Sequence, residues 1–169
     1  MRKRRDPAAR PRGSAKERAL GLLAVRWRSR AELDRRLRRA GFDPEEVGSA
    51  IEDMEQAGLV DDARFARELV ADRAGRRLAG DRAVRYALLA KGVAGDIAAQ
   101  AMEAAGDETA RALALARKRA GRLGPFEPDA AYRRLYGLLV RRGFGPSVAR
   151  EACRQALREV LPEVEEPGE

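Results

Sequence analysis

Histidine is absent from this 169-residue sequence, and cysteine occurs once, at Cys153. Without histidine the chain has no Ser-His or Cys-His pair, no imidazole base and no zinc site of the usual Cys and His kind. A single cysteine also excludes an internal disulfide, which fits a reducing compartment. We therefore expect a protein that is not an enzyme, that uses no cofactor or metal, and that works in the cytoplasm.

Aromatic residues and long apolar runs are also scarce. Aromatics make up only 5% of the chain, too few for a sandwich or barrel of short strands rich in Tyr, Phe and Trp. No apolar run approaches the roughly 18 residues of a membrane-spanning helix, and the residues after Met1 do not resemble a signal peptide. The sequence thus predicts no membrane partner. A hydrophobic share of 44% is still enough to build a core.

Arginine is what the chain has in excess. Lysine and arginine number 35 against 27 Asp and Glu, which gives a net charge of +8, and all but four of the 35 are arginine. Residues 1–14 form a basic tail that we expect to be disordered, and residues 161–169 form an acidic tail. Because guanidinium groups pair with phosphates and carboxylates, the positive balance between the tails indicates a polyanionic partner, either nucleic acid or a protein with an acidic face.

One pattern of apolar residues and glycine occurs three times at intervals of 51 residues. Its copies contain Leu33, Leu37 and Gly41, then Val84, Leu88 and Gly92, then Leu135, Leu139 and Gly143. The spacing is helical, and each glycine suits the left-handed position that closes a helix. Further helices are predicted to start at a Ser29-x-x-Glu32 capping box and at Asp43-Pro44.

Each copy contains one more helix ahead of this pair, over about residues 15–27, 62–78 and 108–121. The predicted fold is therefore all-α, with three tandem three-helix, helix-turn-helix-like repeats over residues 15–60, 61–106 and 107–160. A three-helix unit of this size is marginally stable alone, so neighbouring repeats should pack together into an elongated, curved body. Such a body is better suited to lying along a partner than to enclosing a small molecule.

Four segments resemble the RecX family, whose members regulate the RecA recombinase. The segment GLVDDARFA at residues 58–66 is similar to the family's hallmark, and residues 28–42, 80–93 and 138–144 resemble its first, second and third modules. The resemblance covers about residues 15–158 and implies a fold of three-helix repeats. It also implies a function: binding to RecA and to its filament on single-stranded DNA, with inhibition of the ATPase and strand-exchange activities of RecA, in recombination, DNA repair and the SOS response.

The hallmark segment allows a metal or acid–base interpretation and a structural one. Two adjacent aspartates could serve such a site together with Glu68, but a helix start capped by carboxylates is favoured, because Phe65 and Leu69 follow at helical spacing. Cys153 replaces Ile51 and Met102 of the other copies, which predicts a buried, inert thiol. We expect mainly structural roles for the family-motif residues Gly58, Asp61, Asp62, Phe65, Ala66, Gly41, Gly92 and Gly143.

Arginines clustered in each repeat are the candidates for contact with RecA or DNA. The alternative is a set of solvated helix faces with intrahelical pairs such as Glu32 with Arg36. Trp27 lies in a basic cluster, where it either stacks on an unpaired base or, as we favour, closes the core of the first repeat. The contact candidates are Arg26, Arg28, Arg30, Arg35, Arg38, Arg39, Arg73, Arg76, Arg77, Arg134, Arg141 and Arg142.

Two functions of different classes compete. The first is a non-enzymatic regulator, which we expect to be monomeric and to lie along the RecA filament; weak binding of single- and double-stranded DNA is compatible with it. The second is a direct nucleic-acid-binding helix-turn-helix repeat protein, which predicts tight DNA binding without a partner and a steep salt dependence. The first is preferred, because no predicted helix carries Asn, Gln and Arg together at base-reading positions.

Overall fold

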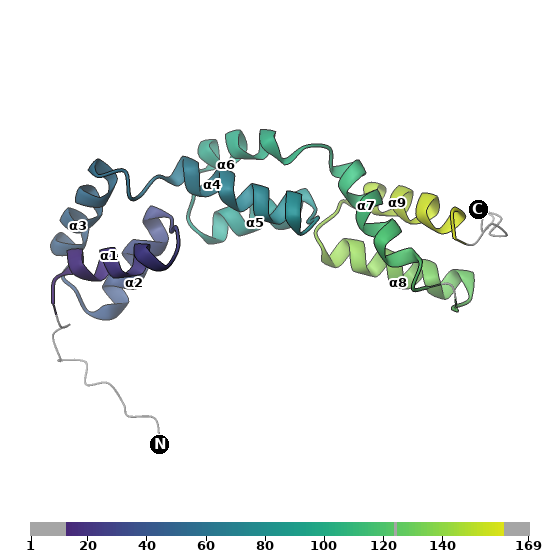
Figure 1. The fold of residues 1–169 in the computed structure, drawn as a ribbon, viewed down its shortest axis with the longest axis horizontal. Coiled ribbons are helices and arrows are strands. Elements are labelled where there is room, and N and C mark those ends of the chain that lie inside the picture. Colours follow the sequence, from purple (N-terminus) through teal and green to yellow (C-terminus); the bar gives the residue numbers. More distant parts are fainter. Residues whose placement is uncertain (1–12, 124, 161–169) are drawn as a thin grey trace, which may run out of the picture. The chain divides into compact units, whose positions relative to one another are not determined.

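The computed structural model describes residues 13–123 and 125–160, and these residues form helices and turns without a β-strand (Figure 1). The predicted basic and acidic tails lie outside this range, apart from Gly13 and Ser14. The predicted all-α fold is confirmed. The helices are α1 (Ala15–Val25), α2 (Arg30–Ala40), α3 (Pro44–Gln56), α4 (Asp62–Val70), α5 (Asp81–Ala90), α6 (Gly95–Met102), α7 (Glu108–Ala120), α8 (Pro128–Arg141) and α9 (Pro146–Arg158), with a π-helical segment η1 (Ala71–Arg76) and a 3₁₀ turn η2 (Glu103–Ala105).

Two compact units divide the chain between them. The first contains the residues up to Ala66 together with Leu88–Ala98, and the second contains Arg67–Ala87 together with the residues from Ala99 onward. Each of α4, α5 and α6 is therefore shared between the two units. The middle repeat contributes to both units, and the repeat boundaries near residues 60 and 107 stay a prediction, as does the elongated, curved shape.

In the first unit, α3 packs against both α1 and α2. Leu33 and Leu37 of α2, one turn apart, are completely buried, and Val47 and Ile51 of α3 are at most 1% exposed. Residues four apart lie on one face of a helix, so each helix presents an apolar stripe to the shared core. This is the packing that the repeated apolar spacing predicts.

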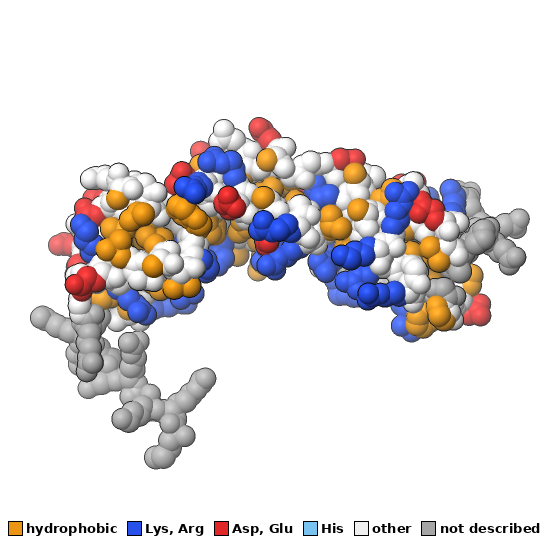
Figure 2. All heavy atoms as spheres, in the orientation of Figure 1, with side chains coloured by type: hydrophobic (Ala, Val, Ile, Leu, Met, Phe, Trp, Pro, Cys, Tyr) orange, Lys and Arg blue, Asp and Glu red, His pale blue; other side chains and the backbone are white. Residues whose placement is uncertain are grey.

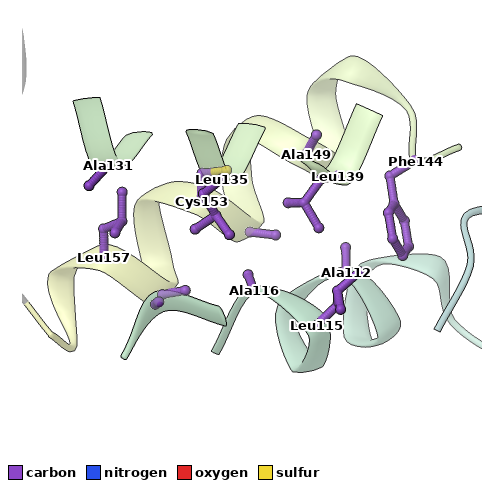
Figure 3. Packing of buried hydrophobic residues seen from close by; sticks show 13 residues of the cluster. Ala112, Leu115, Ala116, Ala131, Leu135, Leu139, Phe144, Ala149, Cys153 and Leu157 are labelled. Carbon is purple, nitrogen blue, oxygen red and sulfur yellow. The ribbon is translucent and has the colours of Figure 1, made fainter. Parts of the chain in front are cut away.

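In the second unit, α7, α8 and α9 form the corresponding core, shown in Figure 3. Leu135 and Leu139 of α8 belong to this core together with Cys153 of α9 and the alanine-rich face of α7, where Ala112 and Ala116 are completely buried. Burial raises the pKa of the Cys153 thiol to about 12. The prediction of a buried thiol is thus confirmed, and the thiol stays protonated because no solvent reaches it.

Side-chain caps form at the predicted starts of α2 and α3, with one difference from the prediction. Asp43 caps α3, because its carboxylate accepts from the backbone N–H of Glu45 at 2.9 Å. At α2, Ser29 Oγ accepts from the Glu32 N–H at 3.1 Å. The predicted capping box is only half formed, however, because the Glu32 carboxylate turns toward a group of cations instead of toward the Ser29 backbone.

The three repeated glycines close helices in the left-handed conformation, as predicted. Their φ angles are +97° at Gly41, +75° at Gly92 and +88° at Gly143. Two of them also permit close contacts. In the first unit a Cβ at Gly92 would lie 2.5 Å from that of Ala31 on α2, and in the second unit a Cβ at Gly143 would overlap Ala83 on α5. Glycine is required at both places because one helix end abuts another helix start.

Candidate functional site

A buried carboxylate among four cations stands at the start of α2 in the first unit. Glu32 and Arg28 are each only 5% exposed. Arg28 Nη1 donates to Glu32 Oε1 at 2.8 Å, and Lys91 Nζ donates to Glu32 Oε2 at 3.0 Å. Arg26 and Arg36 donate to the same carboxylate. These contacts tie the α1–α2 turn and the end of α5 to α2 through one charge.

The pKa of Glu32 is lowered to about 2. Burial by itself raises this pKa, but hydrogen bonds and charges from Lys91 and Arg26 outweigh the burial. The carboxylate is therefore ionised at neutral pH and balances its surrounding cations. Because four cations already bind the Glu32 carboxylate, its role is to stabilise the fold and not to bind a substrate.

Arg28, a predicted contact residue, is bound to groups inside the first unit, and its contact with a partner stays a prediction. Its guanidinium donates to Glu32 and, through Nε, to the Leu22 carbonyl oxygen at 3.1 Å, both inside the first unit. The pKa of Arg28 is lowered, first by burial and then by Arg26 and Arg36, while Glu32 acts in the opposite direction. Arg28 is thus a structural cation that happens to lie in a basic stretch of sequence.

The aspartates of residues 58–66 cap helix starts, which confirms the structural interpretation. Asp61 accepts from the Arg64 backbone N–H at 2.9 Å at the start of α4. Asp62 accepts from the Arg30 backbone N–H at 2.8 Å and so also caps α2. Phe65, as predicted, is a buried anchor of α4 with 7% exposure. Within the described part of the chain, no group of three or more Asp, Glu, His or Cys side chains could hold a metal ion.

Trp27 does not close the core of the first repeat, so that prediction is wrong. The side chain is 37% exposed, and the Arg64 guanidinium carbon lies 4.0 Å from its ring centroid. A cation over the ring face gives the indole a favourable position at the surface. The alternative, stacking of Trp27 on an unpaired base, stays a prediction, and Arg64 already occupies one face of the ring.

The arginines of α2 differ in what already binds them. Arg38 pairs with Asp34 at 2.9 Å, and Arg35 donates to the Ala90 carbonyl oxygen at 3.2 Å. Arg39 is exposed, and its side chain makes no hydrogen bond or ion pair to the residues that the structure describes. A pocket of about 390 Å³ between α1 and α2 is lined by Arg18, Glu32, Arg35, Arg36 and Arg39, together with Leu22 and Ala40. Figure 2 shows Lys and Arg side chains gathered over this part of the first unit.

The remaining candidates of the first two repeats are mostly paired. Arg30 lies 3.0 Å from Glu55, and Arg76 and Arg77 both pair with Asp72, at 3.0 and 2.9 Å. Arg73 is exposed on η1, and its side chain has no such partner in residues 13–123 or 125–160. Exposed ion pairs of this kind contribute little to stability, so a strong anion can displace them.

In the second unit, two of the three candidates from the last repeat line one pocket. Arg134 and Arg141 of α8 face a pocket of about 430 Å³ between α7 and α8. Arg142 instead donates to the Arg77 carbonyl oxygen at 3.0 Å, which joins the end of α8 to the segment after η1. The structure thus brings some of the predicted arginines together and assigns others to internal contacts.

Comparison with known proteins shows to which family the chain belongs. Models of the first, second and third three-helix domains of RecX match residues 15–54, 61–102 and 106–153 in that order. The chain belongs to the RecX family. It is 40% identical over 147 residues to the regulatory protein RecX of Amycolatopsis mediterranei, covering 86% of this chain and 84% of that protein. It is 37% identical over 155 residues to the RecX of Corynebacterium efficiens, covering 88% and 74%.

The fold also matches that of solved RecX structures. The crystal structure of RecX from Lactobacillus salivarius superposes with a TM-score of 0.71 at 20% identity, over 84% of this chain and 94% of that one. The match to curated RecX proteins supports a regulatory role for this chain, and the match to the structure supports three tandem three-helix domains. No helix among the residues that the structure describes is long and apolar enough to cross a bilayer.

A second buried cation of this RecX chain was missed by sequence reasoning. Arg111 of α7 is 8% exposed and donates to the carbonyl oxygens of Gly106, at 2.7 Å, and Ala105, and to the Asp81 carboxylate. Its position could have signalled this role, because Arg111 lies one turn before the buried Leu115 and therefore on the apolar face of α7. A cation on an apolar stripe usually has internal partners.

Proposed function

We propose that this chain binds the RecA recombinase and its filament on single-stranded DNA, and that it inhibits the ATPase and strand-exchange activities of RecA. One observation carries the proposal: three RecX domains follow one another in family order over most of the chain. Relatives that match most of this chain are regulatory proteins. RecA is the regulated enzyme that the family resemblance implies.

Exposed guanidinium groups of the first unit supply a surface for this partner. Arg18 and Arg39 lie at the pocket between α1 and α2 and have no side-chain partner among the described residues. A recombinase filament on DNA presents phosphates, and unpaired arginines are attracted to them over several ångströms. The buried Arg28–Glu32 pair beneath keeps α2 in position, so the exposed arginines need little reorganisation on binding.

Inhibition in this proposal comes from occupancy and not from chemistry. Three copies of one helical pattern give a single chain related surfaces, which suit contacts with more than one RecA subunit. A chain bound across neighbouring subunits restrains their motion relative to each other, and the bound state is favoured by the sum of its contacts. RecA subunits restrained in this way hydrolyse ATP and exchange strands more slowly.

The test is RecA ATP hydrolysis on single-stranded DNA with increasing amounts of the purified chain. We expect the rate to fall as the chain approaches a stoichiometric ratio to RecA. Arg39→Glu should shift the required concentration upward by about fivefold, since it replaces an attraction by a repulsion worth about 1 kcal/mol. Arg67→Glu, which changes the net charge equally at an exposed site of α4, is the matched control and should shift it by less than about twofold. An ATPase rate that stays unchanged at equimolar chain contradicts the proposal.

A further inference from the structure

The pocket between α7 and α8 concentrates positive charge without any counter-charge. Its volume is about 430 Å³, and no Asp or Glu of the described residues lines it. Apolar side chains, Leu123, Leu135 and Leu138, supply part of its wall. The cations that line it are Arg119 of α7, Arg122 in the turn after α7, and Arg133, Arg134 and Arg141 of α8.

Most of these guanidinium groups are available to a ligand. The side chains of Arg122, Arg133 and Arg141 are exposed and make no hydrogen bond or ion pair within residues 13–123 and 125–160. The Nε of Arg119 is buried and has no hydrogen-bond acceptor among the described residues. A buried donor without an acceptor is unfavourable and is rare in native proteins. An anion in the pocket would bring acceptor oxygens next to the Arg119 side chain, which lines it.

Two contacts hold other arginines in place before any ligand binds. The Arg134 guanidinium carbon lies 4.1 Å from the centroid of the Phe126 ring, so the aromatic face fixes this side chain. Arg141 extends back along α8 over Gly137, where a Cβ would lie 3.1 Å from Arg141 Nη1. The glycine thus leaves room for the guanidinium, at the usual cost of a glycine inside a helix. Preorganised forks of this kind bind phosphate oxygens well.

In the pocket between α1 and α2, by contrast, a carboxylate balances part of the positive charge. This pocket also contains several arginines, but Glu32 lines it and accepts from Arg36 at 3.3 Å. Arg35 is partly satisfied as well, by the Ala90 carbonyl oxygen. No carboxylate lines the α7–α8 pocket, so a ligand of that pocket needs more negative charge than a ligand of the α1–α2 pocket.

We propose that the α7–α8 pocket binds a compact polyphosphate, namely the triphosphate group of a nucleoside triphosphate. A triphosphate concentrates several negative charges at one point, which suits a pocket lined by five arginines, whereas a DNA strand distributes single charges along a line that continues beyond the pocket. The volume lies within the range of roughly 300–1,000 Å³ for small-molecule sites. No Asn or Gln lines the pocket to recognise a base, so the nucleotide's identity is not read.

The experiment is calorimetric titration of the full chain, without RecA and with EDTA, using ATP, GTP and inorganic tripolyphosphate. We expect one site of similar affinity, within about threefold, for all three, because the phosphates supply the binding energy. Arg119→Ala and Arg133→Ala should each weaken binding about tenfold, the loss of one charge-assisted hydrogen bond. Arg39→Ala, an equal change of charge in the α1–α2 pocket, is the control and should change affinity by less than about twofold.

A competing DNA strand distinguishes the source of the phosphates. A thymidine oligonucleotide at equal total phosphate should leave tripolyphosphate bound; complete displacement would identify a strand-binding site and overturn the proposal. Binding that Arg119→Ala leaves unchanged would also overturn it. Because RecA is absent from the titration, its outcome is independent of the proposed inhibition of RecA.

Gly137→Ala separates binding from folding. An alanine here removes the cost of glycine within α8 and should raise the Tm by about 2–4 °C. The same methyl group would lie 3.1 Å from Arg141 Nη1, so the guanidinium must shift, and tripolyphosphate binding should weaken. A variant that is more stable yet binds more weakly cannot owe its defect to misfolding. Unchanged affinity would remove Arg141 from the site and contradict the geometry proposed for it.

Discussion

Glu32→Gln is expected to lower the free energy of unfolding at pH 7 by about 3 kcal/mol. The pKa of Glu32 is about 2 in the folded chain, against an ordinary value of 4.5, and this difference corresponds to about 3 kcal/mol. The substitution also leaves Arg28 buried without its carboxylate, and breaking one side of a buried ion pair is strongly destabilising. Urea denaturation of the variant and the parent chain, followed by circular dichroism, measures the difference.

The pH dependence identifies the carboxylate as the cause. A lowered folded-state pKa stabilises the chain above pH 4.5, and this stabilisation is lost as the pH falls from 4.5 toward 2. The gap between parent and Glu32→Gln should therefore shrink over that interval. Asp34→Asn, which removes the exposed pair with Arg38, is the control and should cost less than about 1 kcal/mol at pH 7. A gap that stays constant down to pH 2 would contradict the role given to Glu32.

Gly143→Ala is expected to destabilise the second unit by about 2–5 kcal/mol. The glycine has φ +88°, which costs an L-residue about 1–2 kcal/mol. A Cβ there would also lie 2.6 Å from the backbone nitrogen of Ala83, and backbone at the start of α5 moves less easily than a side chain. Overpacking of this kind typically adds about 1–3 kcal/mol. Thermal and urea unfolding of the variant measure the total.

Gly58→Ala is the matched control for that substitution. Gly58 has a similar left-handed conformation, with φ +66°, but a Cβ there would meet nothing within 4 Å. Only the conformational cost applies, so we expect a loss of about 1–2 kcal/mol. If the two variants were equally stable, the close approach of the α8 end to α5 would not limit the residue at position 143.

Local features of this fold were predictable from sequence because a few neighbouring residues decide them. Gly41, Gly92 and Gly143 end helices, since glycine alone adopts a left-handed conformation without strain. Asp43-Pro44 and Asp61 start helices, because a carboxylate two or three residues ahead meets a free backbone N–H. The spacing of Leu33 and Leu37 likewise places both on one buried face.

Side chains of the same type, by contrast, have different roles that no local pattern distinguishes. Arg28, Arg39 and Arg119 all stand in basic stretches of sequence, yet one is buried on Glu32, one is exposed and one lines the α7–α8 pocket. Trp27 is exposed beneath Arg64, although its sequence context suits a core position as well. The partner of each charged side chain comes from distant sequence, as Lys91 does for Glu32.

By itself, the sequence determined the all-helical class, the threefold repeat, the helix ends at the repeated glycines and the family, because each depends on spacing within a few turns or on a recurring motif. The helix predicted over about residues 62–78 instead ends at Val70 and is followed by the π-helical segment η1. The tertiary structure alone decided which cations are neutralised, since desolvation and ion pairing depend on what surrounds a side chain in space. It also decided that a pocket rich in arginine stays uncompensated in the second unit, because α7 and α8 bring no carboxylate to it.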